Sequence, residues 1–464
     1  MNQFKLNYIF INHLIPVILC ALFFFTGCLN HKKNENGVIS GEYYDWTKTM
    51  QPETPWNYDY NKTLVTKMFL CSRDSIGNVD QVFLKFEDAL EVIRKIDNIT
   101  LGIPKITYLV GWQYNGHDSK YPAWGEVNKH LKRDQDSTAL ASLQWLMKES
   151  KVYNTTVSFH INMIDAFMDS PLWDEYMTND IVAKDTLGNP IKGEVFAGMQ
   201  SFQLSYAKEW ELGLAQKRID KLIEMIPEIS DAGTIHIDAF HSMRASGPGE
   251  PISPYLGNSI EDEICAQRKI FRYWQSKGID VTSEGAKYWL RKDPFIGLQA
   301  MTWHFNEENF VREDWPNKPK DFIALPAIFS AYSPMHCEGE IMKDHENLTG
   351  LIEPSFLNLI PWYYKRNSDA SQRGDVIITQ DLIICPILWK EKSIAVYSKE
   401  KDLTNLEITV PSTWGKVKQV QIFELTIEGL KPFAETKITN GSVLFSVTKG
   451  IPLVLMPFAE NSTN

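Results

Sequence analysis

Short apolar runs of strand type alternate along this chain with longer amphipathic runs of helical type, and this serial order most constrains the fold. Strand-type runs are ITYLVGW at 106–112, TTVSFHIN at 155–162, TIHIDAF at 234–240 and IDVTSEG at 279–285. Helical patterns separate them at 137–153, 205–226 and 259–278, and similar units fit 64–96 and 297–332. Repeated βα units of this kind predict an α/β fold, a (β/α)8 (TIM) barrel over residues 59–380.

Residues 381–464 carry a different pattern. Short alternating strands follow one another without helical periods between them and are joined by turn residues, as in SIAVYS, LEITVPS and SVLFSV. This part of the chain therefore predicts a small antiparallel β-sandwich domain after the barrel.

The first 28 residues have the layout of an export signal, with a Lys near the start and a long apolar run. Residues 25–28, FTGC, resemble a bacterial lipobox, which implies cleavage before Cys28 and lipidation of its thiol. The alternative is an uncleaved N-terminal anchor helix. We expect a protein of the bacterial cell envelope, held to a membrane on the periplasmic or cell-surface side, with residues 29–58 as a tether and lead-in.

Composition excludes several classes of function. The 58 acidic and 47 basic residues give a net charge of −11, which disfavours a nucleic-acid partner. The thiols beyond residue 28 show no CxxC or Cys/His metal spacing, so we expect them to be buried apolar residues, with one bridged pair as the alternative. The sequence contains no Gly-rich phosphate loop, HExxH or GxSxG motif, and we predict no cofactor and no bound metal.

Polar and aromatic residues stand where consecutive predicted strands end. In a (β/α)8 barrel the carboxyl ends of the strands carry the active site. Aromatic rings with His, Asn and acidic side chains are typical of a carbohydrate site, in which hydroxyls need polar partners and ring faces need an apolar platform. The candidates at these strand ends are Trp112, His160, Asn162, Asp238, Glu284 and Trp303.

Two of these candidates are acids on neighbouring strand ends, Asp238 and Glu284. Cleavage of a glycosidic bond needs one ionised carboxylate and one protonated carboxylic acid, so we predict Asp238 as nucleophile and Glu284 as general acid and base. His236 and His241 flank Asp238 and are predicted to keep it ionised or to contact substrate. The structural alternatives are a strand-end cap for Asp238 and a surface ion pair for Glu284.

The segments LVGWQYNGHDSKYPAWGEVN, VSFHINMIDAF and IHIDAFHS resemble glycoside hydrolase family 101, the endo-α-N-acetylgalactosaminidases, and the related family 129. The resemblance covers roughly residues 60–310, in matching order. It implies a retaining α-glycosidase in which Asp238 is the nucleophile and Glu284 the acid/base. It also implies a sugar subsite lined by His117, Asp118, His160 and Asn162, and a substrate with α-linked N-acetylgalactosamine or galactose, such as a mucin-type O-glycan or glycoprotein.

Three other interpretations stay open from sequence. The barrel could be an α-galactosidase or α-glucosidase of a related family, or a carbohydrate-binding lipoprotein that has lost hydrolysis. A metal-dependent hydrolase is suggested only by His residues next to acids. Trp112 and Trp303 could be sugar platforms or core residues, and their strand-end positions favour the platform.

Overall fold

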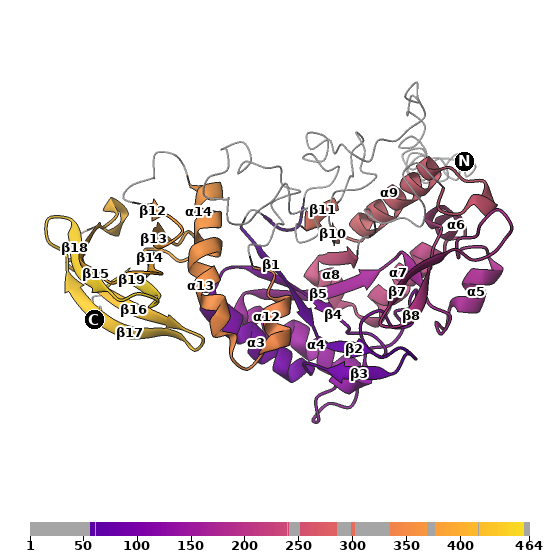
Figure 1. The fold of residues 1–464 in the computed structure, drawn as a ribbon, viewed down its shortest axis with the longest axis horizontal. Helices are drawn as coiled ribbons and strands as arrows, with labels where there is room; N and C mark the ends of the chain where they lie inside the picture. The colour runs from indigo at the N-terminus through magenta and orange to yellow at the C-terminus, as the bar shows by residue number, and fades with distance from the viewer. Residues whose placement is uncertain are drawn as a thin grey trace, which may run out of the picture.

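The computed structural model describes residues 56–60, 62–238, 240, 251–284, 298–301, 335–368, 376–415 and 417–458. Six parallel strands form its central sheet in the order β1-β4-β5-β9-β10-β11 (Figure 1). Their bounds are β1 Leu64–Phe69, β4 Lys105–Val110, β5 Thr155–Asn162, β9 Thr234–Asp238, β10 Asp280–Glu284 and β11 Leu298–Met301. The expected parallel α/β core of the TIM-barrel type is confirmed, because the six strands lie side by side in chain order. Of the unit expected over 297–332, only β11 lies within the described residues.

Helices follow the strands as the amphipathic patterns predict. Their bounds are α3 Phe86–Ile99, α4 Ala139–Glu149, α5 Trp173–Thr178, α6 Tyr206–Glu211, α7 Leu214–Met225, α8 Glu228–Ala232 and α9 Ile260–Ser276. The helix expected over 205–226 is two helices, because Gly213 between them adopts a left-handed φ of 72°. A capping box begins α9, with the side chains of Ser259 and Asp262 each bonded to the other's backbone amide.

Two small antiparallel sheets branch from the barrel. One pairs β2 Cys71–Arg73 with β3 Val79–Val82, and the other has the order β6-β8-β7, with β6 Asp165–Ala166, β7 Lys192–Phe196 and β8 Met199–Gln203. Both follow the carboxyl end of a barrel strand, β1 and β5 respectively. They therefore surround the end at which the candidate residues were predicted to gather.

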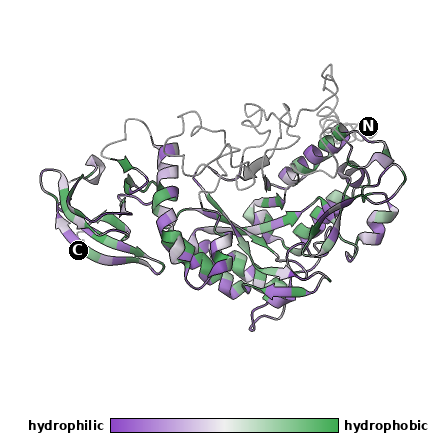
Figure 2. Ribbon diagram, in the orientation of Figure 1, coloured by the Kyte–Doolittle hydropathy of each residue, from purple (hydrophilic) through white to green (hydrophobic). Residues whose placement is uncertain are grey.

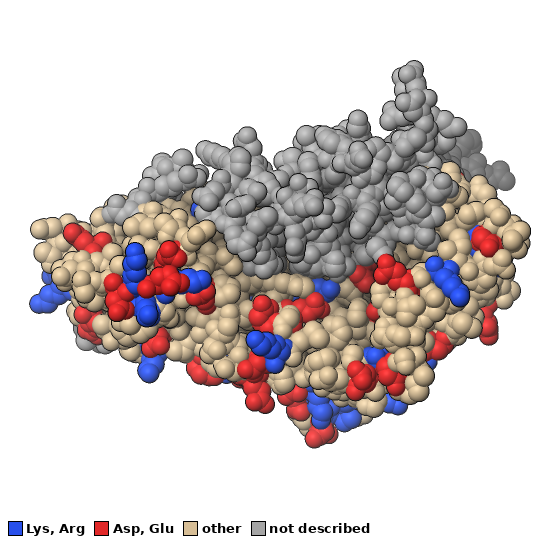
Figure 3. All heavy atoms as spheres, viewed as in Figure 1, with Lys and Arg blue, Asp and Glu red and all other residues tan. Residues whose placement is uncertain are grey.

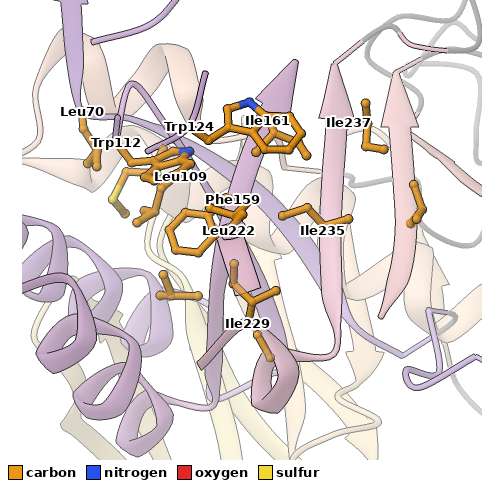
Figure 4. Packing of buried hydrophobic residues seen from close by; sticks show 14 of the residues in the cluster. Leu70, Leu109, Trp112, Trp124, Phe159, Ile161, Leu222, Ile229, Ile235 and Ile237 are labelled. Carbon is orange, nitrogen blue, oxygen red and sulfur yellow. The ribbon is translucent and has the colours of Figure 1, made fainter. Parts of the chain in front are cut away.

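The main hydrophobic core lies between the parallel sheet and its helices. Figure 4 shows Leu109, Phe159, Ile161 and Ile235 of the strands packed with residues such as Leu222 and Ile229 from the helical layer. Hydrophobic and hydrophilic residues both occur along the strands (Figure 2). Nearly all residues of β1, β4, β5 and β9 are nevertheless buried, as expected for a parallel sheet that is covered by helices.

Buried polar groups join the helices to one another. Glu263 of α9 is buried and accepts hydrogen bonds from the Ser205 hydroxyl, at 2.7 Å, and from the backbone amide of Ala207, at 2.8 Å, at the start of α6. Burial raises the pKa of Glu263 to about 7. On the neighbouring face, Arg218 of α7 and Glu209 of α6 form a buried ion pair with an Nε to Oε1 distance of 2.7 Å.

The C-terminal part consists of antiparallel sheets, as expected. A six-stranded sheet has the order β12-β13-β14-β19-β16-β17, and a two-stranded sheet pairs β15 with β18. The bounds are β12 Ile377–Ile378, β13 Leu382–Pro386, β14 Ile394–Ser398, β15 Leu403–Thr409, β16 Gln419–Thr426, β17 Gly429–Lys437, β18 Ser442–Val447 and β19 Leu453–Pro457. Side chains from both sheets, among them Val396, Ile422 and Val443, form one hydrophobic cluster.

Three helices lie between the barrel and the C-terminal sheets (Figure 1), namely α12 Glu338–Lys343, α13 Ile352–Pro354 and α14 Ile360–Asn367. A second cluster joins Phe356 and Tyr364 from this segment to Ile383 and Tyr397 from the sheet. Trp389, just after β13, packs against both this cluster and the barrel core, and its indole N–H donates to the backbone oxygen of Thr100 at 2.9 Å.

Most of the described cysteines are buried, as the sequence predicts. Cys71, Cys265, Cys337 and Cys385 form no disulfide, and three of them are buried, so the bridged-pair alternative is wrong for these residues. Acidic and basic side chains are interspersed over the face shown in Figure 3. Within the described part of the chain, no helix has the length and apolar character needed to cross a bilayer.

Candidate active site

Asp238 ends β9, and its side chain is one-fifth exposed. It borders a pocket of about 290 Å³ at the carboxyl end of the barrel. This volume is at the lower end of the roughly 300–1,000 Å³ typical of small-molecule sites. The pocket lining consists of Lys67, Phe69, His117, His160, Asp238, Glu338 and Met342. Three of the predicted site residues, His117, His160 and Asp238, are therefore brought together.

A row of aromatic rings runs from the pocket into the barrel interior. Ring centroids are 5.3 Å apart for Phe69 and His117, 5.5 Å for His117 and His160, 5.3 Å for His160 and His236, and 5.2 Å for His236 and Tyr108. Strand alternation explains the row, because His160 and His236 face each other across β5 and β9. The packing fixes the ring of His160 beside Asp238.

Two polar side chains of β5 lie next to the Asp238 carboxylate. Nε2 of His160 lies 3.4 Å from its Oδ2, and the side-chain amide of Asn162 donates to the same oxygen at 3.4 Å. Asn162 is almost fully buried and also donates to Asp165 at 2.8 Å. Burial, together with the nearby Asp118 carboxylate, raises the pKa of Asp165 to about 7.

His117 and Asp118 lie in the loop after β4. The loop approaches β2 so closely that a Cβ on Gly111 would stand 2.2 Å from the backbone oxygen of Cys71. Arg73 fixes the far side by donating from Nε to the backbone oxygen of Asp118 at 2.6 Å. His117 thereby reaches the pocket, with Nε2 3.5 Å from the Asp118 carboxylate. Asp118 stands directly behind His117 and is not among the lining residues.

The expectation that Trp112 forms a sugar platform is wrong. Its side chain is completely buried, packs against Phe159 with ring centroids 4.6 Å apart, and donates its indole N–H to the backbone oxygen of His160 at 3.1 Å. Figure 4 shows the indole within the hydrophobic cluster. The strand ends at Val110 and the positive φ of Gly111 redirects the chain, so the residue after it turns into the core.

His236 also differs from its predicted role as a substrate contact. It is completely buried below the pocket, and its Nδ1 shares a 2.8 Å hydrogen bond with the Thr282 hydroxyl. Strand alternation places it one layer beneath Asp238. His236 therefore supports His160 and does not line the pocket.

The predicted acid/base residue stands at the expected place in the backbone. Glu284 is the last residue of β10, one position beyond Ser283, which pairs with Ile237. The two strand ends that carry Asp238 and Glu284 are therefore adjacent. The side chain of Glu284, and the whole of His241 and Trp303, lie outside the described residues.

Sequence reasoning missed Lys67, Phe69, Glu338 and Met342 as pocket residues. A signal for Lys67 was present, because it is the only charged residue in β1 and is buried there. Glu338 gave none, because it comes from α12, which follows β1 by more than 250 residues and packs against that strand. Among the described residues, no group of three or more His, Cys, Asp or Glu is arranged to hold a metal ion.

A (β/α)8-type fold with a carboxylate and imidazoles in a small pocket at its strand ends is an arrangement found in glycoside hydrolases. Residues 72–287 match the family model of glycoside hydrolase family 101, described as endo-alpha-N-acetylgalactosaminidase. The resemblance to that family is therefore confirmed over this part of the chain, which includes Asp238 and Glu284. No curated protein sequence matches the chain.

Three solved structures with similar folds have low sequence identity. The alpha-N-acetylgalactosaminidase NagBb from Bifidobacterium bifidum, in its GalNAc complex, is 14% identical with a TM-score of 0.41, over 59% of this chain and 42% of NagBb. An alpha-amylase from Geobacillus thermoleovorans is 9% identical with a TM-score of 0.42, over 86% and 99% of the two chains. The alpha-galactosidase TtGalA from Thermus thermophilus is 12% identical with a TM-score of 0.33, over 61% and 52%. The chain spans less than half of the length of NagBb.

Proposed function

We propose that this protein is a retaining glycoside hydrolase that acts on α-linked N-acetylgalactosamine or galactose of mucin-type O-glycans. One observation carries the proposal, namely the position of Asp238. It is a strand-end carboxylate on the wall of a small pocket, within the segment that matches the endo-alpha-N-acetylgalactosaminidase family.

In the proposed reaction, Asp238 attacks C1 of the sugar while the carboxylic acid of Glu284 gives its proton to the glycosidic oxygen. The bond between C1 and that oxygen breaks, and a glycosyl ester forms on Asp238. Glu284, now ionised, takes a proton from a water molecule whose oxygen attacks C1. The ester bond breaks, the Asp238 carboxylate is restored and Glu284 is again protonated. Two inversions at C1 retain the α configuration.

The neighbours of Asp238 suit the role of an ionised nucleophile. The amide of Asn162 donates to its Oδ2, and the Nε2 of His160 is close to the same oxygen, each at 3.4 Å. Hydrogen bonds to a carboxylate favour its ionised form. His160 supplies such a bond in the tautomer that carries a proton on Nε2.

The remaining pocket residues suit a monosaccharide unit. The Lys67 ammonium and the Glu338 carboxylate offer a donor and an acceptor for ring hydroxyls, and His117 offers a further polar contact. Phe69 and Met342 offer apolar surface to the C–H groups of the ring. The pocket thus combines a few polar groups with an apolar wall, as carbohydrate recognition requires.

We also propose that the protein is exported and lipidated at Cys28, on the basis of residues 25–28 alone. Labelling with radioactive palmitate tests this. The full chain should carry the label and a Cys28→Ala variant should not, and equal labelling of the two would refute the lipid anchor.

The activity can be tested with a soluble form that starts at Leu29. We would measure release of p-nitrophenol from the α-GalNAc, α-galactose, α-glucose and Galβ1,3GalNAc-α glycosides. Asp238→Asn and Glu284→Gln should each lower kcat by on the order of 10³-fold or more, because each removes a reacting group. Asp231→Asn is a matched control, since Asp231 is exposed on α8.

The outcomes separate the candidate functions. Proton NMR of the first product should show the α-anomer, and azide should rescue the Asp238→Gly variant as an azide adduct. Turnover of only the galactoside would restrict the proposed sugar to galactose, and turnover of only the glucoside would favour the α-glucosidase alternative. Sugar binding by calorimetry without turnover of any glycoside would identify a carbohydrate-binding lipoprotein. Full activity of Asp238→Asn would refute the proposed nucleophile.

A further inference from the structure

The side chain of Asn162 uses its whole hydrogen-bonding capacity within the protein. Its Oδ1 accepts from the backbone amides of Ile164 and Asp165, both at 2.8 Å. Its Nδ2 donates to the Asp165 carboxylate at 2.8 Å and to Asp238 at 3.4 Å. A primary amide has two donor hydrogens and two acceptor lone pairs. The predicted role of Asn162 as a direct sugar contact therefore conflicts with its observed contacts.

We infer that Asn162 and Asp165 are positioning residues, which together hold the Asp238 carboxylate in the orientation that the reaction needs. The inference rests on the proposed function, in which Asp238 is the nucleophile. Asp165 fixes one hydrogen of the Asn162 amide and thereby directs the other toward Oδ2 of Asp238. His160 stands beside the same oxygen, so two side chains from β5 restrict rotation of the carboxylate.

Asp165 and Asn162 are themselves held in place by the surrounding fold. Asp165 is buried, and its backbone pairs with Gln203 in the small sheet of β6, β7 and β8. The backbone oxygen of Asn162 lies 3.5 Å from Nη1 of Arg218, whose guanidinium is held by both oxygens of Glu209. Asn162 is thus held through its main chain as well as its side chain. Misplacement of a reacting group by about 1 Å is enough to lower a rate by on the order of 10²-fold.

Two substitutions of Asp165 test the inference. Asp165→Ala removes the acceptor that orients the amide, and kcat should fall by roughly 10- to 100-fold with KM within about threefold of wild type. Asp165→Asn keeps an acceptor oxygen and should retain most of kcat. A neutral side chain is tolerable there because burial already raises the pKa of Asp165 to about 7.

Asn162→Asp separates the two functions of the amide. It keeps an oxygen for the backbone amides of Ile164 and Asp165, but it removes the amide that donates to Asp238 and to Asp165 and adds a carboxyl group beside them. We expect kcat to fall at least as far as in Asp165→Ala, again with little change in KM. Thermal melting of each variant shows whether a lost activity comes from lost folding.

Three results would overturn the inference. A raised KM with unchanged kcat in Asn162→Asp would make Asn162 a sugar contact. An equal loss of kcat in Asp165→Asn and Asp165→Ala would make the charge of Asp165, not orientation, the important property. The third is structural and independent of turnover: crystal structures of wild type and Asp165→Ala should show different orientations of the Asp238 carboxylate, and identical orientations would refute positioning. If the wild type turns over no glycoside, the proposed function fails, while the crystallographic comparison still decides the inference.

Discussion

A buried ion pair between Arg218 and Glu209 lies next to the candidate site, where Arg218 contacts the backbone oxygen of Asn162. The Glu209 side chain is 0% exposed and that of Arg218 is 7% exposed. Arg218 donates from Nε to Oε1 at 2.7 Å and from Nη2 to Oε2 at 3.0 Å, and Tyr176 donates to Oε1 at 2.7 Å. The guanidinium carbon also lies 4.3 Å from the ring centre of Trp124.

Substituting Arg218 by Met keeps most of the side-chain volume and removes the cation. The carboxylate of Glu209 then stays buried with the Tyr176 hydroxyl as its remaining donor from this group. Loss of one partner of a buried pair costs about 3–5 kcal/mol, mainly because the other charge is left uncompensated. With an unfolding entropy of about 2.1 cal/mol/K per residue over a cooperative unit of about 400 residues, this corresponds to a decrease in Tm of roughly 4–6 °C.

Differential scanning calorimetry of wild type, Arg218→Met and the double variant Glu209→Met/Arg218→Met measures this effect. The double variant should recover much of the lost stability, because replacement of both charges by apolar groups of similar volume is often close to neutral. A decrease in Tm of less than about 1 °C in the single variant would refute the reasoning. A double variant as unstable as the single one would show that lost packing on Trp124, not the stranded charge, causes the destabilisation.

Three further predictions concern the pocket and the core. Trp112→Phe should lower the free energy of unfolding in urea by about 1–3 kcal/mol, because the His160 carbonyl loses its indole donor. The variant should leave KM within twofold of wild type, and a raised KM with normal stability would restore the platform role. Lys67→Met should raise KM for the active glycoside by roughly 10- to 100-fold, because a charge-assisted hydrogen bond to the sugar is lost. Lys62→Met is a control at an exposed lysine and should leave KM unchanged. Equal KM values for the two variants would show that Lys67 does not contact the sugar. Burial raises the pKa of Glu263 to about 7 in the folded protein, so the folded state binds its proton more tightly than the unfolded state and stability is lost as pH rises from about 4.5 to 7. The free energy of unfolding of Glu263→Gln should therefore exceed that of wild type by up to roughly 3 kcal/mol between pH 5 and pH 8. Urea midpoints of the two proteins that change in parallel with pH would contradict this sign.

The sequence predicted those features that depend on local pattern. The alternation of strands and helices indicated the parallel core, and the break of an apolar run at Asp238 indicated the end of β9, where the pocket lies. His160 was found for the same reason, since it belongs to the inward-facing set of β5. These features follow from strand periodicity, which the sequence shows directly.

Other features depend on contacts that no local pattern contains. Trp112 looked like a strand-end platform, but the turn at Gly111 directs it into the core, and this turn is imposed by the close approach of β2. Glu338 reaches the pocket only because α12 packs against β1. The sequence placed Asn162 correctly beside Asp238. Its role, however, depends on contacts with Asp165 and two backbone amides, and these contacts are set by the conformation of the loop after β5.

The C-terminal sheets share side chains with the barrel, and this limits how the molecule can be divided. Trp389 and Ile352 each pack against both clusters, so neither core is complete without the other. A chain shortened before β12 would expose the apolar side chains of Phe356 and Tyr364 to water and would favour aggregation. The two parts should accordingly unfold in a single cooperative transition. The C-terminal sheets are in this sense not a transferable module, and exchange of the barrel between related proteins would have to carry them along.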